Sequence, residues 1–443
     1  MSGGSAATED GGRPSGGEGS QDGGRSSGGE GSQDGGRPSG GEGSQDGGRS
    51  SGGGGGDLRI GVAGFGLRRS VALEAHRPGR GSRVAAVCDP RQDALDAARR
   101  DLGPGLRTTA DFARLLDEDV DAVIILTPDH THAELAVRAL KARKPTFVEK
   151  PLAITLDDCD LILRTAHERR TRLYVGHNMR HMPVVRTMRR LIAEGAIGEV
   201  KAIWCRHFVG DGGDYYFKDW HADRRNTGGL LLQKGAHDID VIHWLAGSRT
   251  VRVTGMGGLT VYGGITDRAE GLPADWYDPA RNWPPLAQKG LNPVVDVEDL
   301  SMMHMRLENG VYAGYQQCHF TPDYWRNYTV IGTEGRLENF GDTGTGSVVR
   351  VWNAGRRGYD PEGDLTVPVF AGEGGHGGAD QELVTEFVRF AREGGATDTS
   401  PVAARDSVAA GLLATESLRG GSVPLDVPPL SPELEEYFSG GQC

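Results

Sequence analysis

Short apolar segments alternate with helical patterns between residues 58 and 176, and this alternation limits the fold more than any other feature of the sequence. The apolar segments, which are predicted strands, cover 58–63, 83–88, 121–126, 145–148 and 173–176. The helical patterns cover 67–76, 92–100, 111–116, 131–142 and 156–169. Short apolar strands that alternate with helices are typical of a parallel sheet with helices on both faces. Residues 57–176 are therefore predicted to form an α/β domain.

Longer strands replace the short apolar ones after residue 177. The predicted elements are helices at 184–194, 229–245, 381–392 and 403–418, and strands at 199–208, 303–307, 311–315, 327–331 and 336–340. Asn309-Gly310 is a strong signal for a two-residue hairpin turn. The sequence thus predicts an α+β domain over 177–420 with a large, mostly antiparallel sheet, followed by a C-terminal extension over 421–443. Within it, residues 263–297 are predicted to be a long functional loop.

Residues 1–56 contain 24 of the 70 glycines and repeat one 12-residue unit at 11–22, 23–34 and 35–46. The unit has no apolar side chain, so stacked copies have nothing to bury. We predict a disordered, Gly/Ser-rich tail rather than a repeat fold.

Charge, hydropathy and cysteine usage exclude several classes of protein. The net charge of −12 makes nucleic acid and anionic membrane surfaces unlikely partners. The sequence has no apolar run of about 18 residues, so no transmembrane helix is predicted. Its five cysteines are scattered and odd in number, which favours reduced thiols in the cytoplasm.

A glycine turn follows the first strand. Gly64 allows a tight turn, and Gly66 lets the backbone approach a pyrophosphate at a helix N-terminus. The third glycine of the usual G-x-G-x-x-G pattern is Arg69 here. Asp89 ends the second strand, where a carboxylate accepts hydrogen bonds from a ribose diol. This order predicts a dinucleotide site of the Rossmann type that prefers NAD, with NADP possible because Arg91 is near; the alternative is an empty doubly wound domain.

Glu149-Lys150-Pro151 follows the strand at 145–148. Ligands of such sheets bind outside the carboxyl ends of the strands, so Lys150 is expected in the crevice beside a nicotinamide. Its positive charge would stabilise the alkoxide that develops as an alcohol is oxidised. The alternative is an ordinary surface lysine.

A second candidate segment covers residues 228–247. On one helix, Gln233, His237, Asp240 and Trp244 would share a face. His237 is a candidate acceptor for a hydroxyl proton, because the histidine pKa lies near working pH. The alternative is a core histidine that hydrogen-bonds to Asp240.

These motifs together resemble the glucose–fructose oxidoreductase/inositol dehydrogenase (Gfo/Idh/MocA) family over about residues 57–420. Glu149-Lys150-Pro151 is similar to its most characteristic tripeptide, and the segment from Thr127-Pro128 to His132 resembles its nicotinamide-side loop. The resemblance implies an NAD(P)-dependent oxidoreductase that acts on a CH–OH group of a sugar, cyclitol or related polyol. It maps the family's lysine and histidine onto Lys150 and His237.

The departure at Gln233, where the family has an aspartate, puts a proton relay through that residue in doubt. The predicted catalytic residues are Lys150, His237, Asp240 and Gln233. The predicted cofactor-binding residues are Gly64, Phe65, Gly66, Leu67, Arg68, Asp89, Thr127, Pro128, His132, Glu149 and Lys150. The predicted substrate-binding residues are Asn178, Arg180, Lys218, Asp219, His221 and His376.

Two other functions stay open at this point. One is a glycosidase or lyase that retains NAD and oxidises its substrate transiently, and the other is a non-catalytic NAD(P)-binding sensor, which Gln233 favours. His376 and Asp380 are too few ligands to predict a metal site. Few helices are predicted after residue 250, so we expect a homodimer or homotetramer in which the open sheet faces pack together.

Overall fold

The computed structural model describes residues 56–443 except 211, 272–282, 345, 371, 373 and 443. The predicted tail, apart from Gly56, therefore lies outside the described residues, as does the middle of the predicted loop at 263–297. None of the helices within these ranges is long and apolar enough to cross a membrane.

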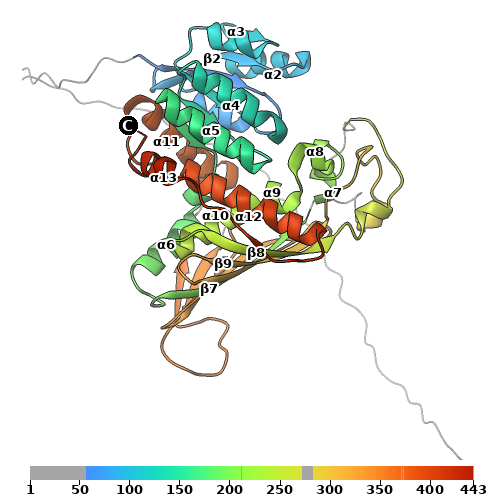
Figure 1. The fold of residues 1–443 in the computed structure, drawn as a ribbon, viewed down its shortest axis with the longest axis vertical. Helices are drawn as coiled ribbons and strands as arrows, with labels where there is room; N and C mark the ends of the chain where they lie inside the picture. The colour runs from blue at the N-terminus through green and yellow to red at the C-terminus, as the bar shows by residue number, and fades with distance from the viewer. Residues whose placement is uncertain are drawn as a thin grey trace, which may run out of the picture. The chain divides into compact units, whose positions relative to one another are not determined.

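The first domain is built on a six-stranded parallel sheet with the order β3-β2-β1-β4-β5-β6. Its strands are β1 (Leu58–Ala63), β2 (Ser82–Cys88), β3 (Arg107–Thr109), β4 (Ala122–Ile125), β5 (Thr146–Val148) and β6 (Leu173–Val175). Its helices are α1 (Arg69–Ala75), α2 (Gln92–Leu102), α3 (Phe112–Asp117), α4 (His132–Lys141) and α5 (Leu156–Arg169). The predicted parallel α/β domain is confirmed (Figure 1).

Helices from the C-terminal part of the chain complete the core of this first domain. Leu383 and Phe387 of α11 (Ala379–Glu393) join the buried cluster that contains Ile60 of β1. Tyr437 of α13 (Pro432–Ser439) joins the cluster on the other side of the sheet, which contains Cys159 of α5. Helices that follow most of the second domain's strands in the sequence therefore pack into the core of the first domain.

The second domain is built on a nine-stranded sheet with the order β14-β13-β12-β11-β7-β10-β9-β8-β15. Its strands are β7 (Val200–Val209), β8 (Thr250–Gly258), β9 (Leu300–Leu307), β10 (Tyr312–Cys318), β11 (Tyr324–Gly332), β12 (Arg336–Phe340), β13 (Val348–Trp352), β14 (Leu365–Pro368) and β15 (Leu425–Asp426). β7 and β10 pair in parallel, and the other described pairs of this sheet are antiparallel. The predicted large, mostly antiparallel sheet is confirmed.

Helices cover one face of the nine-stranded sheet. α6 (Pro183–Ala193) packs on β12 and β13, α10 (Gly235–Ala246) on β7 and β10, and α12 (Pro401–Arg419) on β8. Buried and more exposed side chains alternate along β7, β9 and β10, because only every second residue points toward these helices. The opposite face carries exposed Trp204 and Tyr312.

The helix predicted over 229–245 is two helices, α9 (Leu230–Gln233) and α10, which meet at Lys234. Two further short helices, α7 (Gly212–Tyr215) and α8 (Arg224–Thr227), precede them. β13, β14 and α13 were not predicted. The pair Ser431-Pro432 at the start of α13 was a usable signal, since proline is favoured at the first position of a helix.

Candidate functional site

The glycine turn between β1 and α1 requires glycine for two reasons. Gly64 has φ +88°, a conformation that residues with a side chain rarely adopt, and a Cβ added there would lie 2.8 Å from the backbone of Leu126. At Gly66 the space is open, because an added Cβ would meet nothing closer than Arg91 Nη2 at 3.7 Å. The turn can therefore admit a group close to its backbone, as a pyrophosphate requires.

Asp89 lies at the carboxyl end of β2 and is 5% exposed. Its Oδ2 accepts a hydrogen bond from the amide of Phe65 at 2.9 Å, and its Oδ1 accepts one from the amide of Arg91 at 2.9 Å. Each carboxylate oxygen has two lone pairs, so acceptor capacity is left for a ribose diol. Asp89 thus both fixes the glycine turn and offers a charge at the expected ribose position.

Arg68, a predicted cofactor-binding residue, pairs with two carboxylates. Its Nε donates to Glu149 Oε1 at 2.6 Å, and its two terminal nitrogens donate to Asp380 at 3.0 and 3.2 Å. Arg68 therefore links the glycine turn to β5 and α11 through three of its five N–H donors. The sequence could not show this, since Asp380 is far away in the chain.

The segment after β4 is held in place by His132. Its Nδ1 lies 2.8 Å from the carbonyl oxygen of Pro151, and its Nε2 lies 2.9 Å from that of Thr127. The Thr127-Pro128 segment is thereby fixed against the Glu149-Lys150-Pro151 segment. His132 is fully buried, so it positions the two segments and does not face a ligand.

Lys150 lies at the carboxyl end of β5 and reaches the second domain. Its Nζ donates a hydrogen bond to the backbone carbonyl of Gln233 at 3.2 Å. Burial lowers the pKa of Lys150, although Asp129 and Glu149 act in the opposite direction. Burial likewise raises the pKa of Asp129, against the effect of His132 and Lys150. Lys150 thus stands between the two domains, beside the buried carboxyl of Asp129.

His237 follows Gln233 by one turn and is 7% exposed. Its Nδ1 has no hydrogen-bond partner among the described residues. Burial lowers the pKa of His237 well below its ordinary value, and Lys150, Lys234 and Arg326 lower it further. The imidazole is therefore neutral and has a nitrogen available to accept a proton.

Asp240 does not contact His237, which corrects the expectation that it holds this imidazole directly. Its carboxylate accepts two hydrogen bonds from Arg180, at 2.7 and 2.6 Å, and lies 3.4 Å from Nδ1 of His177. Burial alone would raise the pKa of Asp240, but Arg180 and His177 more than offset this and hold it well below its ordinary value. The ring of His177 stands 6.4 Å from that of His237, centroid to centroid.

Three predicted substrate-binding residues make contacts that hold the structure together. Arg180, besides its pair with Asp240, donates to the carbonyl of Asp398 at 2.7 Å. Asn178 donates to Asp380 Oδ1 at 2.8 Å, and Nδ1 of His376 lies 3.3 Å from Asp380 Oδ2. The contact of Asn178 joins the start of the second domain to α11, while Oδ1 of Asn178 keeps no partner among the described residues.

The other three, Lys218, Asp219 and His221, lie in or next to the short helical turn Trp220–Ala222 and are buried. Asp219 accepts a hydrogen bond from the backbone amide of His221 at 3.0 Å and also pairs with its ring. The ring of His221 stands 5.2 Å from that of Tyr216 and interacts electrostatically with Asp129. His221 therefore lies in the same group of side chains as Asp129 and Lys150, and the role of Lys218 stays a prediction.

Sequence reasoning missed Asp129, His177, His319 and Arg326. Asp129 lies inside the segment from Thr127 to His132, which contains predicted cofactor-binding residues. Its position two residues after Thr127, just beyond the end of β4, was a usable signal. Arg326 and His319 had none, because they reach the cluster through the pairing of β10 and β11 with β7. A pairing between distant strands cannot be read from local sequence.

The described residues fit a dinucleotide. The glycine turn, Asp89, Thr127 and Lys150 lie at the carboxyl ends of β1, β2, β4 and β5, where such sheets bind ligands. Several buried polar atoms in this region have no hydrogen-bond partner among the described residues, including Glu149 Oε2, Asn178 Oδ1, Gln233 Oε1 and His237 Nδ1. Buried polar atoms are normally satisfied, so these are expected to meet a ligand or water. Among the described residues, no group of three His, Cys, Asp or Glu side chains could hold a metal ion.

Family models match both domains. Residues 58–177 match the oxidoreductase family with an NAD-binding Rossmann fold, and residues 185–338 match the GFO/IDH/MocA C-terminal domain. The chain belongs to this family of NAD-binding oxidoreductases, as its motifs predicted.

Individual relatives are more distant. The chain is 33% identical over 202 residues to inositol 2-dehydrogenase 1 of Saccharopolyspora erythraea, which is 44% of this chain and 57% of that protein. It is 32% identical over 186 residues to 2,7-anhydro-N-acetylneuraminate hydratase of Mediterraneibacter gnavus, 42% of this chain and 48% of that protein. The match thus spans about half the length of these relatives. A solved levoglucosan dehydrogenase in complex with NADH and levoglucosan has the same fold, with a TM-score of 0.69, 22% identity, and coverage of 84% of this chain and 100% of that one.

Proposed function

We propose that the protein is an NAD-dependent dehydrogenase that oxidises a CH–OH carbon of a sugar, cyclitol or related polyol, or reduces the matching carbonyl. The observation that carries this proposal is the meeting of Lys150 and His237 beside the dinucleotide turn. Lys150 donates to the backbone of Gln233 at 3.2 Å, and its charge acts on the neighbouring His237. The inositol dehydrogenase relative supports the substrate class.

Oxidation of an alcohol breaks the O–H bond and the C–H bond. Bound NAD supplies the acceptor for the hydride, which leaves carbon with both electrons of the C–H bond. In this proposal the Lys150 ammonium stabilises the alkoxide that develops on the substrate oxygen. His237, which is neutral, takes the hydroxyl proton on a ring nitrogen.

Asp240 acts through His177 in this proposal, rather than on His237 itself. Its carboxylate lies 3.4 Å from Nδ1 of His177, whose ring stands edge-on to that of His237. The carboxylate of Asp240 thereby fixes the position of the His177 ring beside His237. Gln233 orients a hydroxyl with its unpartnered Oε1 but takes no proton.

A panel of polyols, cyclitols and sugars with NAD and NADP, followed at the absorbance of reduced nicotinamide, tests the proposal. We expect NAD reduction with at least one polyol, and binding of NAD measured separately by calorimetry. NAD binding without turnover of any polyol would instead support the sensor. Tightly retained NAD with substrate conversion but no net absorbance change would support the glycosidase or lyase. One relative of the chain is a hydratase, which favours testing this alternative.

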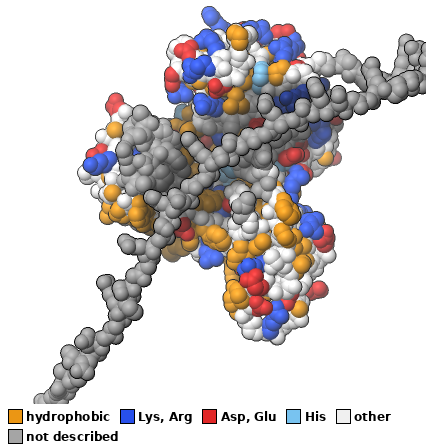
Figure 2. All heavy atoms as spheres, turned by 180° about the vertical axis from the view of Figure 1, so that it is seen from behind, with side chains coloured by type: hydrophobic (Ala, Val, Ile, Leu, Met, Phe, Trp, Pro, Cys, Tyr) orange, Lys and Arg blue, Asp and Glu red, His pale blue; other side chains and the backbone are white. Residues whose placement is uncertain are grey.

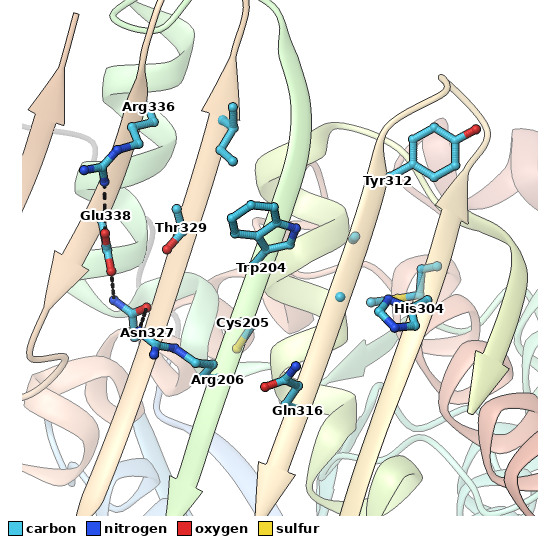
Figure 3. A pocket seen from close by; sticks show the side chains of 14 residues that line it. Trp204, Cys205, Arg206, His304, Tyr312, Gln316, Asn327, Thr329, Arg336 and Glu338 are labelled. Atoms are coloured by element: carbon cyan, nitrogen blue, oxygen red, sulfur yellow. Dashed lines mark hydrogen bonds and ion pairs between the residues drawn. The ribbon is translucent and has the colours of Figure 1, made fainter. Parts of the chain in front are cut away.

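The open face of the nine-stranded sheet supports self-association. Trp204, Met256 and Tyr312 project from it and are 57%, 59% and 65% exposed. A hollow of about 620 Å³ lies on this face, lined by Trp204, Tyr312, His304 and Gln316 and edged by the Arg336–Glu338 pair (Figure 3). Figure 2 shows hydrophobic side chains among charged ones on the lobe that contains this sheet. Exposed apolar patches of this kind mark interaction sites.

We propose that a second copy of the chain covers this face, to give a homodimer or homotetramer. Light scattering at micromolar concentration should give the mass of an oligomer, and Trp204→Glu with Tyr312→Glu should shift it toward the monomer. A wild-type monomer would contradict the proposal. The four described cysteines are free thiols, three of them buried, which supports a reducing compartment such as the cytoplasm.

A further inference from the structure

Lys234 is a half-buried lysine whose ammonium lacks an ionic partner. It stands between α9 and α10, and the contact described for its Nζ is with the ring of Tyr216, whose centroid is 5.6 Å away. No hydrogen-bond acceptor or ion-pair partner for this Nζ occurs among the described residues. The neighbouring arginine differs, since Arg326 pairs with Asp238 at 3.1 Å and with Asp342 at 3.6 Å.

The surroundings of Tyr216 contain a second group without a partner. The ring of His319 stands 5.0 Å from that of Tyr216, centroid to centroid, and is fully buried. Both of its ring nitrogens lack hydrogen-bond partners among the described residues. Its pKa is lowered by burial, with further effects from His207 and Lys234, so His319 is neutral and has one donor and one acceptor to offer. We call Tyr216, Lys234, His221 and His319 the Tyr216 cluster.

The electrostatics of Lys234 agree with a missing counter-ion. Burial lowers its pKa to about 7, helped by Arg326 and Lys150 and only partly opposed by Asp238 and Asp342. Removing an ammonium from water is costly unless an anion compensates. The described protein atoms provide none within ion-pair distance, so Lys234 is available to pair with an anion that a ligand brings.

The cluster adjoins the reacting groups. Lys234 acts electrostatically on His237 and Lys150, and His221 acts on Asp129, which neighbours Lys150. A substrate whose hydroxyl lies at Lys150 and His237 therefore extends toward Tyr216. An anionic group at Lys234 would also offset the cations that keep His237 from accepting a proton.

We propose that Lys234 and His319 form a subsite for a carboxylate of the substrate, so that the substrate is an acidic sugar or polyol, such as a uronate or aldonate. This inference rests on the proposed dehydrogenase function and names its substrate class. One unpaired ammonium matches one negative charge, which favours a carboxylate over a dianionic phosphate. Lys234 directly follows Gln233, whose backbone carbonyl accepts the hydrogen bond from Lys150.

Paired probes test this with binding as the readout. D-Gluconate and D-glucitol share a polyol chain and differ in one terminal carboxylate. D-Glucuronate and D-glucose form a second pair, which differs in a carboxylate at one carbon. D-Glucose 6-phosphate tests a phosphate in place of the carboxylate. Each is titrated by calorimetry into the enzyme saturated with NADH. We expect the acid to bind at least about tenfold more tightly than its neutral partner, the size of a charge-assisted hydrogen bond. Lys234→Met should abolish this ratio, Lys234→Arg should keep part of it, and the surface variant Lys201→Met should not change it.

The outcomes separate the inference from the function on which it rests. Failure of NADH to bind would overturn the dehydrogenase, whatever the probes do. With NADH bound, equal binding of acid and neutral partner, or binding of neither, overturns the carboxylate subsite. Tighter binding of the phosphate overturns the assignment to a carboxylate. Loss of acid and neutral binding in equal measure in Lys234→Met also overturns it, because Lys234 would then serve every substrate alike.

A stability measurement gives an independent check without substrate. The charged groups that act on Lys234 are Arg326, Lys150, Asp238 and Asp342, and the neutral but titratable rings of His237 and His319 lie near it. Its folded pKa is lowered to about 7, so the cost of its charge is fully present below pH 7 and falls as pH rises above it. Lys234→Met should therefore raise the melting temperature, and more at pH 6 than at pH 9. A lower melting temperature at pH 6 would show that the protein itself compensates this charge, and would contradict the subsite.

Discussion

The two sheets of this protein differ in how their strands are built and in how their residues reach the site. The strands of the six-stranded sheet are short and mostly buried, β4 along its whole length, whereas those of the nine-stranded sheet alternate between a covered and an open face. The first sheet contributes residues at consecutive strand ends. The second contributes residues that meet only because distant strands pair, such as β10 and β11 with β7.

This difference separates two kinds of site residue. Gly64, Asp89 and Lys150 follow strands of a parallel sheet, so the order of strands alone brings them to one edge. On the substrate side, Asp240, Arg180 and His177 form a buried set whose members come from different elements. Single substitutions on the two sides should therefore differ in size and in what they change.

The largest effect is expected at Lys150, where the first sheet supplies the charge for chemistry. Lys150→Ala should lower kcat about a hundredfold to a thousandfold, which is the usual cost of losing one group that stabilises a developing oxyanion. The Kd for NAD should change much less, because the ribose and pyrophosphate positions lie at Asp89 and the glycine turn. Steady-state kinetics and NAD calorimetry, with Lys201→Ala as the surface control, measure both. Near-wild-type turnover would remove Lys150 from the mechanism.

A smaller loss is expected on the side of the second domain. His237→Ala should lower kcat by about a hundredfold, the usual contribution of a general base. Gln233→Ala should cost less, because an amide orients a hydroxyl without accepting its proton. Comparing both variants with Lys150→Ala at several pH values shows which domain contributes more to the rate. If Gln233→Ala proved the more damaging of the two, the proton would not go to His237.

The same contrast explains how much the sequence could predict. The parallel sheet, its helices and the positions of Gly64, Asp89 and Lys150 follow from local patterns, and the fold class is confirmed for both domains. The partners of Arg68 and Arg180 do not follow, since Asp380 and Asp240 lie 312 and 60 residues away in the chain. The helix at 229–245 was predicted without its break, because Lys234 itself has helical backbone angles; Gly235, which follows it directly, was a usable signal.

A moderate effect is expected at Asp89, which tests the first sheet alone. Asp89→Asn should raise the Kd for NAD about tenfold, the cost of a charge-assisted hydrogen bond, and should narrow the preference for NAD over NADP. The preference narrows because the carboxylate no longer repels a 2′-phosphate. Calorimetry with both cofactors measures this, and the exposed neighbour Asp93→Asn is the control. Equal affinities of the wild type for NAD and NADP would contradict the role given to Asp89.

The smallest effect is expected outside both sheets. Residues 1–55 hold the Gly/Ser-rich repeats, which have no apolar side chains to add to either core. Gly56 is kept in the truncated protein, because its carbonyl accepts a hydrogen bond from Arg392 at 2.6 Å. The truncated and full-length proteins should therefore agree in melting temperature within about one degree and in kcat/KM within error. A shift of several degrees would mean that the repeats contribute to the stability of the folded domains. The stability of the protein would then depend on the repeats as well as on its two sheets.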